Sequence, residues 1–212
     1  MAELFTEIIR EIQESIAVKK ELAGGATQLI ADAARLIIAS MQSGGKLIVF
    51  GNGGSAADAQ HLSAELVGRY RHNRKALAAI ALTTDSSALT SISNDYGFDS
   101  VFSRQLEAIG KTGDVALAIS TSGNSPNVVR AVTLAKKIGI ATVGLTGRSG
   151  GKLRGCVDIC LSVPSDSTPR IQEAHSLIIH ILSGIVEDAI VNDVRAIETS
   201  KLSTVPKDKD AA

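Results

Sequence analysis

The residues best suited to chemistry lie in the stretch FGNGGSAADAQHLSAELVGRY at positions 50–70. Within it, His61 and Glu65 are four residues apart, a spacing that places both side chains on one face of a helix. An imidazole and a carboxylate arranged in this way can bind a divalent metal ion or move protons. The same spacing also occurs on solvent-facing helices, so the pair alone does not decide between these uses.

A second pair of candidate residues lies near the end of the chain. Gln172 and His180 are eight residues apart in a predicted helix, so they lie near the same face. His180 stands within the apolar run LIIHIL, which indicates burial, and a buried imidazole requires a polar partner. With the earlier pair they offer two imidazoles, one carboxylate and one amide oxygen, which suit zinc or a similar divalent ion. His175 is interpreted as a structural histidine.

Two loops rich in glycine and serine each follow an apolar run that predicts a strand. GNGGS at 51–55 lets the backbone approach a polyol or phosphate closely, and its spacing does not fit the dinucleotide fingerprint. STSGNS at 120–125 precedes a helix that begins at Pro126, and a helix N-terminus favours an anion. No lysine follows, so a sugar phosphate fits better than a nucleotide triphosphate. An ordinary turn capped by Ser125 is the alternative.

The apolar runs also predict the fold. Strands are expected at 46–50, 79–82, 114–120, 141–145 and 159–163, separated by helices. Such βαβ units give a mostly parallel sheet with helices on both faces. Aromatic residues make up only 3% of the chain and Trp is absent, so Ile, Leu, Val and Ala must build the core. Ligands of these sheets bind at the carboxyl ends of the strands, where both loops fall.

We expect three segments along the chain. Residues 1–43 form N-terminal helices that pack on the domain or on a partner subunit, residues 44–195 form the main domain, and residues 196–212 form a polar, disordered tail. The first helix carries an apolar stripe at helical spacing, made of Phe5, Ile8, Ile9, Ile12 and Ile16.

Charge and hydropathy limit the partners. The 22 basic and 22 acidic residues balance, which argues against nucleic-acid binding by bulk electrostatics. The first residues lack a signal-peptide layout, and no apolar stretch approaches the roughly 20 residues of a membrane span. We therefore expect a cytoplasmic protein. One basic run is interpreted as a solvated loop, and it contains Arg69, Arg71, His72, Arg74 and Lys75.

Several motifs together carry a family resemblance. They are FGNGGSAADAQH at 50–61, AELVGR at 64–69, NDYGF at 94–98, ISTSGNSPN at 119–127 and TPRIQEAH at 168–175. The chain resembles the bacterial phosphoheptose isomerases, which are members of the sugar isomerase (SIS) group, from about residue 46 to 187. The resemblance implies a three-layer α/β fold with a flavodoxin-like parallel sheet, a homotetramer with active sites between subunits, and one zinc ion per subunit.

The resemblance also implies a reaction and its residues. The reaction is the interconversion of D-sedoheptulose 7-phosphate and D-glycero-D-manno-heptose 7-phosphate, the first step towards the heptose of lipopolysaccharide. The zinc ligands fall on His61, Glu65, Gln172 and His180. The substrate contacts fall on Asn52, Gly53, Gly54, Asn94, Asp95, Ser120, Thr121, Ser122, Ser125 and Gln172, to which we add Ser55 and Glu65.

Aldose–ketose isomerisation through a cis-enediol requires a base on carbon and an acid on oxygen. We assign these roles as a hypothesis to Glu65 and His180. Two alternatives remain open at this stage. The chain could be a non-enzymatic SIS-fold protein that binds the replication initiator, or an isomerase of another sugar phosphate. The presence of both Glu65 and His180 favours the enzyme.

Overall fold

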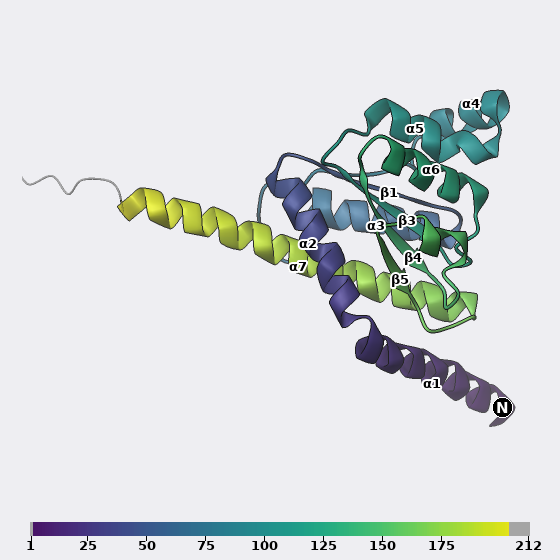
Figure 1. Ribbon diagram of the computed structural model, residues 1–212. Coiled ribbons are helices and arrows are strands. Elements are labelled where there is room, and N and C mark those ends of the chain that lie inside the picture. Colours follow the sequence, from purple (N-terminus) through teal and green to yellow (C-terminus); the bar gives the residue numbers. More distant parts are fainter. Residues whose placement is uncertain (1, 204–212) are drawn as a thin grey trace, which may run out of the picture.

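Five parallel strands form one sheet in a computed structural model, which describes residues 2–203 and the side chains of residues 3–193 (Figure 1). The strand order is β2-β1-β3-β4-β5, the flavodoxin-like order. The strands are β1 (Leu47–Gly51), β2 (Ala79–Ala81), β3 (Val115–Ser120), β4 (Ala141–Thr146) and β5 (Ile159–Ser162). The helices are α1 (Ala2–Gly25), α2 (Thr27–Gln42), α3 (Gly54–Val67), α4 (Ser86–Tyr96), α5 (Val101–Ile109), α6 (Pro126–Lys137) and α7 (Thr168–Ser203).

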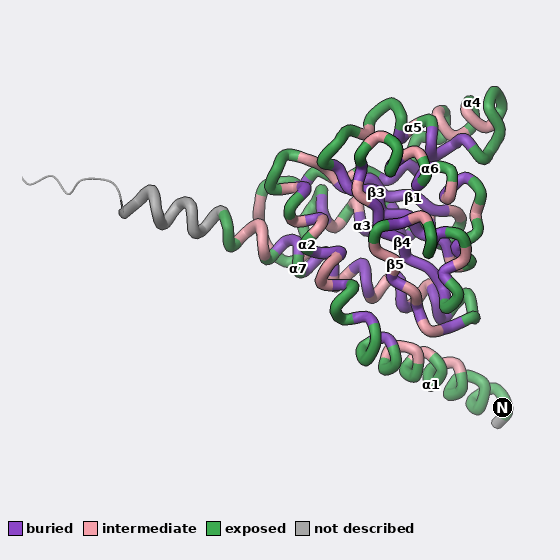
Figure 2. The backbone as a smooth tube through the Cα atoms, in the orientation of Figure 1, coloured by how far each residue is buried: buried purple, intermediate pink, exposed green. Residues whose placement is uncertain are grey.

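Alternate side chains of each strand enter two separate apolar layers, because successive residues of a strand point to opposite faces. In β1, Leu47 and Val49 pack with α2, α3 and α7, whereas Ile48 and Phe50 pack with α5 and α6. Figure 2 shows the buried sheet between these helical layers. The predicted three-layer α/β fold is therefore confirmed, and each strand lies within one residue of its predicted bounds at either end.

The two predicted ligand loops meet at one edge of the sheet. Strands β1 and β3 are neighbours, and Gly51 at the end of β1 pairs with Ile119 near the end of β3. The chain then leaves these strands towards α3 and α6, in opposite helical layers. In sheets of this order, that junction is the topological switch point at which ligands bind.

Helix α1 extends away from the body of the chain and is mostly exposed (Figures 1 and 2). It meets α2 at a bend of 72°. The predicted apolar stripe is not covered by this chain, since Phe5 is 59% exposed and Ile12 is 55% exposed. Arg170 at the start of α7 holds the middle of α1 through the carboxylate of Glu11, at 3.2 Å.

Helix α7 lies across the face of the sheet beside α2 and α3 (Figure 1). Contrary to our expectation that no stretch reaches the length of a membrane span, its Thr168–Asp193 part is long and apolar enough to cross one. However, half of its most apolar stretch is buried within the chain, where Ile178 and Leu182 join the core. This is how a core helix of a globular domain packs. The predicted tail at 196–212 overlaps the end of α7 and otherwise lies outside the described residues.

Candidate active site

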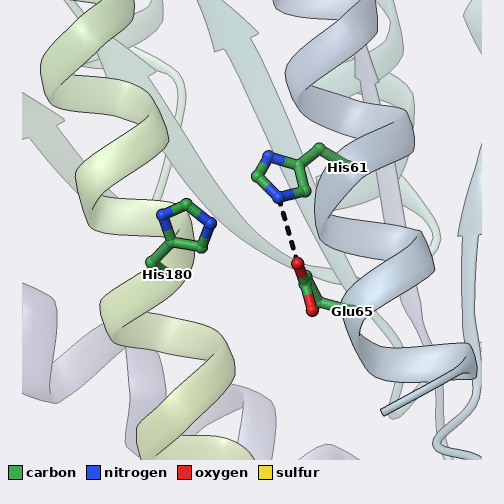
Figure 3. Close-up of side chains that lie close together, drawn as sticks. All are labelled: His61, Glu65 and His180. Atoms are coloured by element: carbon green, nitrogen blue, oxygen red, sulfur yellow. Dashed lines mark hydrogen bonds and ion pairs between the residues drawn. The ribbon is translucent and has the colours of Figure 1, made fainter. Parts of the chain in front are cut away.

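One imidazole–carboxylate cluster forms where α3 and α7 lie side by side (Figure 3). It consists of His61 and Glu65 from α3 and His180 from α7, whose ligand atoms all lie within 4.8 Å of one another. Nε2 of His61 lies 3.1 Å from Oε1 of Glu65. The rings of His61 and His180 are 4.7 Å apart between centroids and nearly perpendicular, at 81°. Two segments far apart in the sequence thus place three donors around one point.

The three donors fit a divalent metal ion. Two imidazole nitrogens and a carboxylate oxygen are a common protein ligand set of catalytic zinc, which leaves a fourth position for water or substrate. The side chains of His61 and Glu65 are 37% and 21% exposed, so the cluster is open to a ligand. Among the described residues, no other group of three histidine, cysteine or acidic side chains gathers in this way.

Gln172, the fourth predicted ligand, lies on an earlier part of α7 than His180. A side chain at Gly54 would stand 2.3 Å from Nε2 of Gln172, so Gln172 lies against the start of α3. His180 is eight residues further along α7, which is about 12 Å along a helix axis. The periodicity correctly gave a shared helix face, but residues on one face can still be more than two turns apart.

The two glycine- and serine-rich loops are joined side by side at the switch point. The side-chain amides of Asn52 and Asn127 each donate to the other, at 2.9 Å in both directions. The hydroxyls of Ser120 and Ser125 lie 3.0 Å apart. Ser125 precedes α6, but its side chain accepts no hydrogen bond from a backbone amide of the helix. This differs from the alternative interpretation, an ordinary turn in which Ser125 caps the helix. The loops therefore present amides and hydroxyls beside two helix N-termini, where anions are favoured.

Glycine is required at the start of α3 for two separate reasons. Gly53 has a φ of 57°, in the left-handed region that side chains rarely adopt. Gly54 leaves the space that Gln172 fills. The next residue, Ser55, is buried. These positions explain the predicted run GNGGS in structural terms, and they place Gln172 next to the predicted substrate loop.

The remaining predicted substrate residues divide into two places. Thr121 and Ser122 line a hollow of about 270 Å³ at the ends of β3 and β4. Asn94 and Asp95 end α4 and are exposed, and α4 packs on the opposite layer through Leu89 and Ile92. One chain therefore does not bring Asn94 and Asp95 to the His61–Glu65–His180 cluster.

Asp58 is a buried carboxylate that the sequence analysis missed. It stands three residues before His61, and Ser176 on α7 donates to its Oδ1 atom. Its other oxygen has no hydrogen-bond partner among the described residues. Burial raises the pKa of the Asp58 carboxyl, while the Ser176 hydroxyl and His61 oppose this shift. The sequence did offer one sign of Asp58, because it is a carboxylate about one helical turn before His61, a candidate metal ligand.

The basic run at 69–75 is only partly the solvated loop that we predicted, because Arg69, Arg71 and Lys75 are exposed whereas Arg74 is not. The side chains of Arg74 and Glu187 are almost completely buried and form an ion pair at 2.9 Å. Burial disfavours the charged form of Glu187, but the backbone amides of residues 70–72 and Arg74 together lower its pKa. His72 pairs with Asp188 at 2.8 Å. Glu187 and Asp188, which lie far along the chain, therefore hold this loop in place, and the composition of the loop itself does not predict these contacts.

His175 agrees with the structural role predicted for it. It is fully buried, and its Nε2 atom donates to the carbonyl of Thr146 at 3.2 Å. Burial lowers the pKa of His175 to about 4, so the ring is neutral at neutral pH. It belongs to the contact between α7 and β4 rather than to the cluster.

Comparison with known proteins gives consistent relatives. The SIS domain family matches residues 10–147. The chain is 51% identical over 187 residues to the phosphoheptose isomerase of Pelobacter propionicus, covering 88% of this chain and 99% of that protein. It is 56% identical over 171 residues to the phosphoheptose isomerase of Geobacter sulfurreducens, covering 81% and 88%.

Solved structures agree with these sequence matches. The phosphoheptose isomerase of Neisseria gonorrhoeae is 45% identical, with a TM-score of 0.83 that covers 87% of this chain and 99% of that one. The Francisella tularensis phosphoheptose isomerase is 39% identical, with a TM-score of 0.84 that covers 87% and 98%. The match therefore extends over nearly the whole length of these relatives.

Proposed function

Since the chain belongs to the SIS-domain family of phosphoheptose isomerases, we propose that it interconverts D-sedoheptulose 7-phosphate and D-glycero-D-manno-heptose 7-phosphate, a step towards the heptose of lipopolysaccharide. The observation that carries the proposal is the convergence of His61, Glu65 and His180 within 4.8 Å. An isomerase requires such a base and acid, whereas a protein that only binds a partner does not.

The residues supply a balanced proton path. The Glu65 carboxylate takes a proton from C1 of the ketose while a ring N–H of His180 gives a proton to the oxygen on C2, which yields a cis-enediol. Glu65 then returns its proton to C2, and His180 takes the proton from the oxygen on C1, which yields the aldose. Each positioned acid or base of this kind contributes roughly 10²–10⁴-fold to the rate.

The same cluster would hold a zinc ion through His61, Glu65 and His180, with Gln172 as the fourth predicted ligand and one ion per subunit. When bound, a divalent cation stabilises the negative charge that develops on the two sugar oxygens. The loops at 51–55 and 120–125 would bind the phosphate and sugar hydroxyls through Asn52, Ser120 and their neighbours. Binding energy from this remote part of the substrate orients the reacting carbons.

We further propose a homotetramer with active sites between subunits. The exposed apolar stripe of α1 supports this proposal, because a stripe of that kind is typical of an interface. The separation of Asn94 and Asp95 from the cluster also supports it, since a neighbouring subunit could supply these two residues. Light scattering on the purified protein tests the assembly, and a monomeric mass would contradict it. We place the enzyme in the cytoplasm, where sugar phosphates are made.

The decisive experiment incubates the purified protein, with its zinc content measured, with sedoheptulose 7-phosphate and follows aldose formation by NMR. Fructose 6-phosphate and ribulose 5-phosphate serve as matched substrates of other chain lengths. Conversion of the heptose alone supports the proposal, and faster conversion of a shorter sugar would reassign the substrate. If no sugar phosphate reacts, with or without added zinc, the alternative of a non-enzymatic partner-binding protein gains support.

A further inference from the structure

The ring of Tyr70 covers one face of the His180 imidazole. The two ring centroids are 5.8 Å apart and the planes are within 22° of parallel. His61 meets the same imidazole nearly at a right angle. His180 is therefore bounded by an aromatic face and by a second imidazole, which together restrict the rotation of its ring.

Tyr70 lies in a loop whose backbone amides are held by one carboxylate, that of Glu187. Oε1 of Glu187 accepts the amide of Tyr70 at 2.9 Å. Oε2 accepts the amides of Arg71 at 2.6 Å and of His72 at 3.0 Å. The side chain of Glu187 is fully buried, so these hydrogen bonds to a charged acceptor are strong ones. The loop position of Tyr70 is thus set by α7, the helix that also carries His180.

The same carboxylate ties the loop to the end of α3. Arg74 donates to Glu187 at 2.9 Å and also to the backbone carbonyls of Leu66 at 2.9 Å and Glu65 at 3.0 Å. These carbonyls belong to the last turn of α3, where the helix leaves its acceptors unpaired. One buried ion pair thereby joins the two helices that supply the cluster.

Two further residues lie against the Tyr70 ring. A side chain at Gly184, one turn after His180, would stand 3.3 Å from Cε1 of Tyr70, so the glycine leaves room for the ring. The guanidinium carbon of Arg71 lies 4.8 Å from the centroid of the Tyr70 ring. The ring is therefore held by α7, by its own loop and by a stacked cation.

We propose that Tyr70 is a positioning residue that fixes the orientation of the His180 imidazole, and that Glu187 holds Tyr70 in place for this purpose. The inference rests on the proposed function in one respect, namely that His180 takes part in metal binding and proton transfer. An imidazole ring whose orientation is fixed before the metal binds loses less conformational freedom on binding. Groups that orient metal ligands typically change metal affinity by roughly 10–100-fold when they are removed.

The test compares Tyr70→Leu, which removes the aromatic face, with Tyr70→Phe, which keeps it. Tyr96→Leu is the matched control, because Tyr96 also stacks with an arginine, Arg104 at 4.6 Å, but does so on α4. Zinc affinity is measured by competition with a chromophoric chelator in the absence of substrate. We expect a loss of roughly 10-fold in Tyr70→Leu, recovery to nearly wild-type affinity in Tyr70→Phe, and no change in Tyr96→Leu.

A second readout needs no metal. The chain contains four histidines, so NMR of the metal-free protein with labelled imidazoles gives few signals, and His180→Gln identifies the signal of His180. The shift that the Tyr70 ring current causes in the His180 signal should disappear in Tyr70→Leu and persist in Tyr70→Phe. Unchanged zinc affinity together with an unchanged His180 signal in Tyr70→Leu would overturn the proposal. A wild-type protein that binds no zinc and isomerises no sugar would instead overturn the proposed function, while the shift would still report on the ring contact.

Discussion

The hydroxyl of Ser176 donates a 2.9 Å hydrogen bond to Oδ1 of Asp58 and so joins α7 to α3 about one turn before the histidine that each helix contributes. Asp58 is buried and Ser176 is half-buried at this contact. A buried polar group left without its partner destabilises a protein by about 1–3 kcal/mol. The pair therefore links the stability of the helix contact to the position of the cluster.

Asp58→Ala should lower the free energy of unfolding by about 1–2 kcal/mol, because it leaves the Ser176 hydroxyl without an acceptor. Asp58→Asn retains the acceptor oxygen and removes a buried charge, so its stability at pH 7 should equal or exceed that of the wild type. Urea unfolding of the metal-free protein measures both. An equal loss in the two variants would show that the charge of Asp58, rather than this hydrogen bond, stabilises the contact.

Glu65→Gln should reduce kcat by at least about 100-fold, because the amide cannot accept the carbon-bound proton. Binding of the substrate phosphate should be preserved, since the loops at 51–55 and 120–125 are untouched. Kinetics and calorimetric titration with the sugar phosphate separate the two effects. Glu107→Gln, an exposed change on α5, is the control. A Glu65→Gln variant with near-wild-type turnover would remove Glu65 from the role of base.

His175 should make the protein less stable as the pH falls from 6.5 to about 4. The pKa of His175 is about 4 in the folded chain, against 6.5 for an unperturbed histidine. The unfolded state therefore takes up the proton first, and the free energy of unfolding falls by up to about 3 kcal/mol across this window.

Replacing the ring tests that assignment. In His175→Gln the same pH window should show a flatter dependence of the unfolding free energy, measured in urea on the metal-free protein. An unchanged slope in His175→Gln would assign the pH dependence to other groups.

Gly54→Ala should impair substrate binding more than stability. The new methyl group would stand 2.3 Å from Nε2 of Gln172 and push this flexible amide away from the first loop. The cost to folding should stay below about 1 kcal/mol, since alanine favours the helix over glycine by a similar amount. KM and thermal unfolding distinguish the two effects. Gly24→Ala, which meets nothing within 4 Å, is the matched control, and equal KM values in the two variants would contradict the prediction.

The sheet and the ligand loops could be predicted from local sequence because their causes are local. Continuous apolar runs such as DVALAIS at 114–120 indicate buried parallel strands. The loops that follow them must then lie at the carboxyl edge of the sheet. The spacing of His61 and Glu65 likewise depends only on helix geometry. For these features, the structure agrees with the sequence interpretation to within about a residue.

The rest depends on contacts between distant residues. The ion pair of Arg74 and Glu187 joins residues 113 positions apart, and no local pattern marks Arg74 as buried. Helix geometry sets a second limit. Helical periodicity gives the direction of a side chain but not its height along the axis, so it does not fix how far the Gln172 amide lies from the His180 ring.

Helices α3 and α7 run alongside each other in the same direction, and their contacts follow in the same order: Gly54 with Gln172, Asp58 with Ser176, and His61 with His180. Tyr70, in the loop after α3, continues this order against Gly184. Inserting one residue into α7 would turn every later side chain by about 100° and separate all the later pairs at once. We therefore expect an insertion or deletion between residues 172 and 187 to be more damaging than a single substitution there. Insertions and deletions are expected instead in the surface loops, where an added residue does not shift the contacts between α3 and α7.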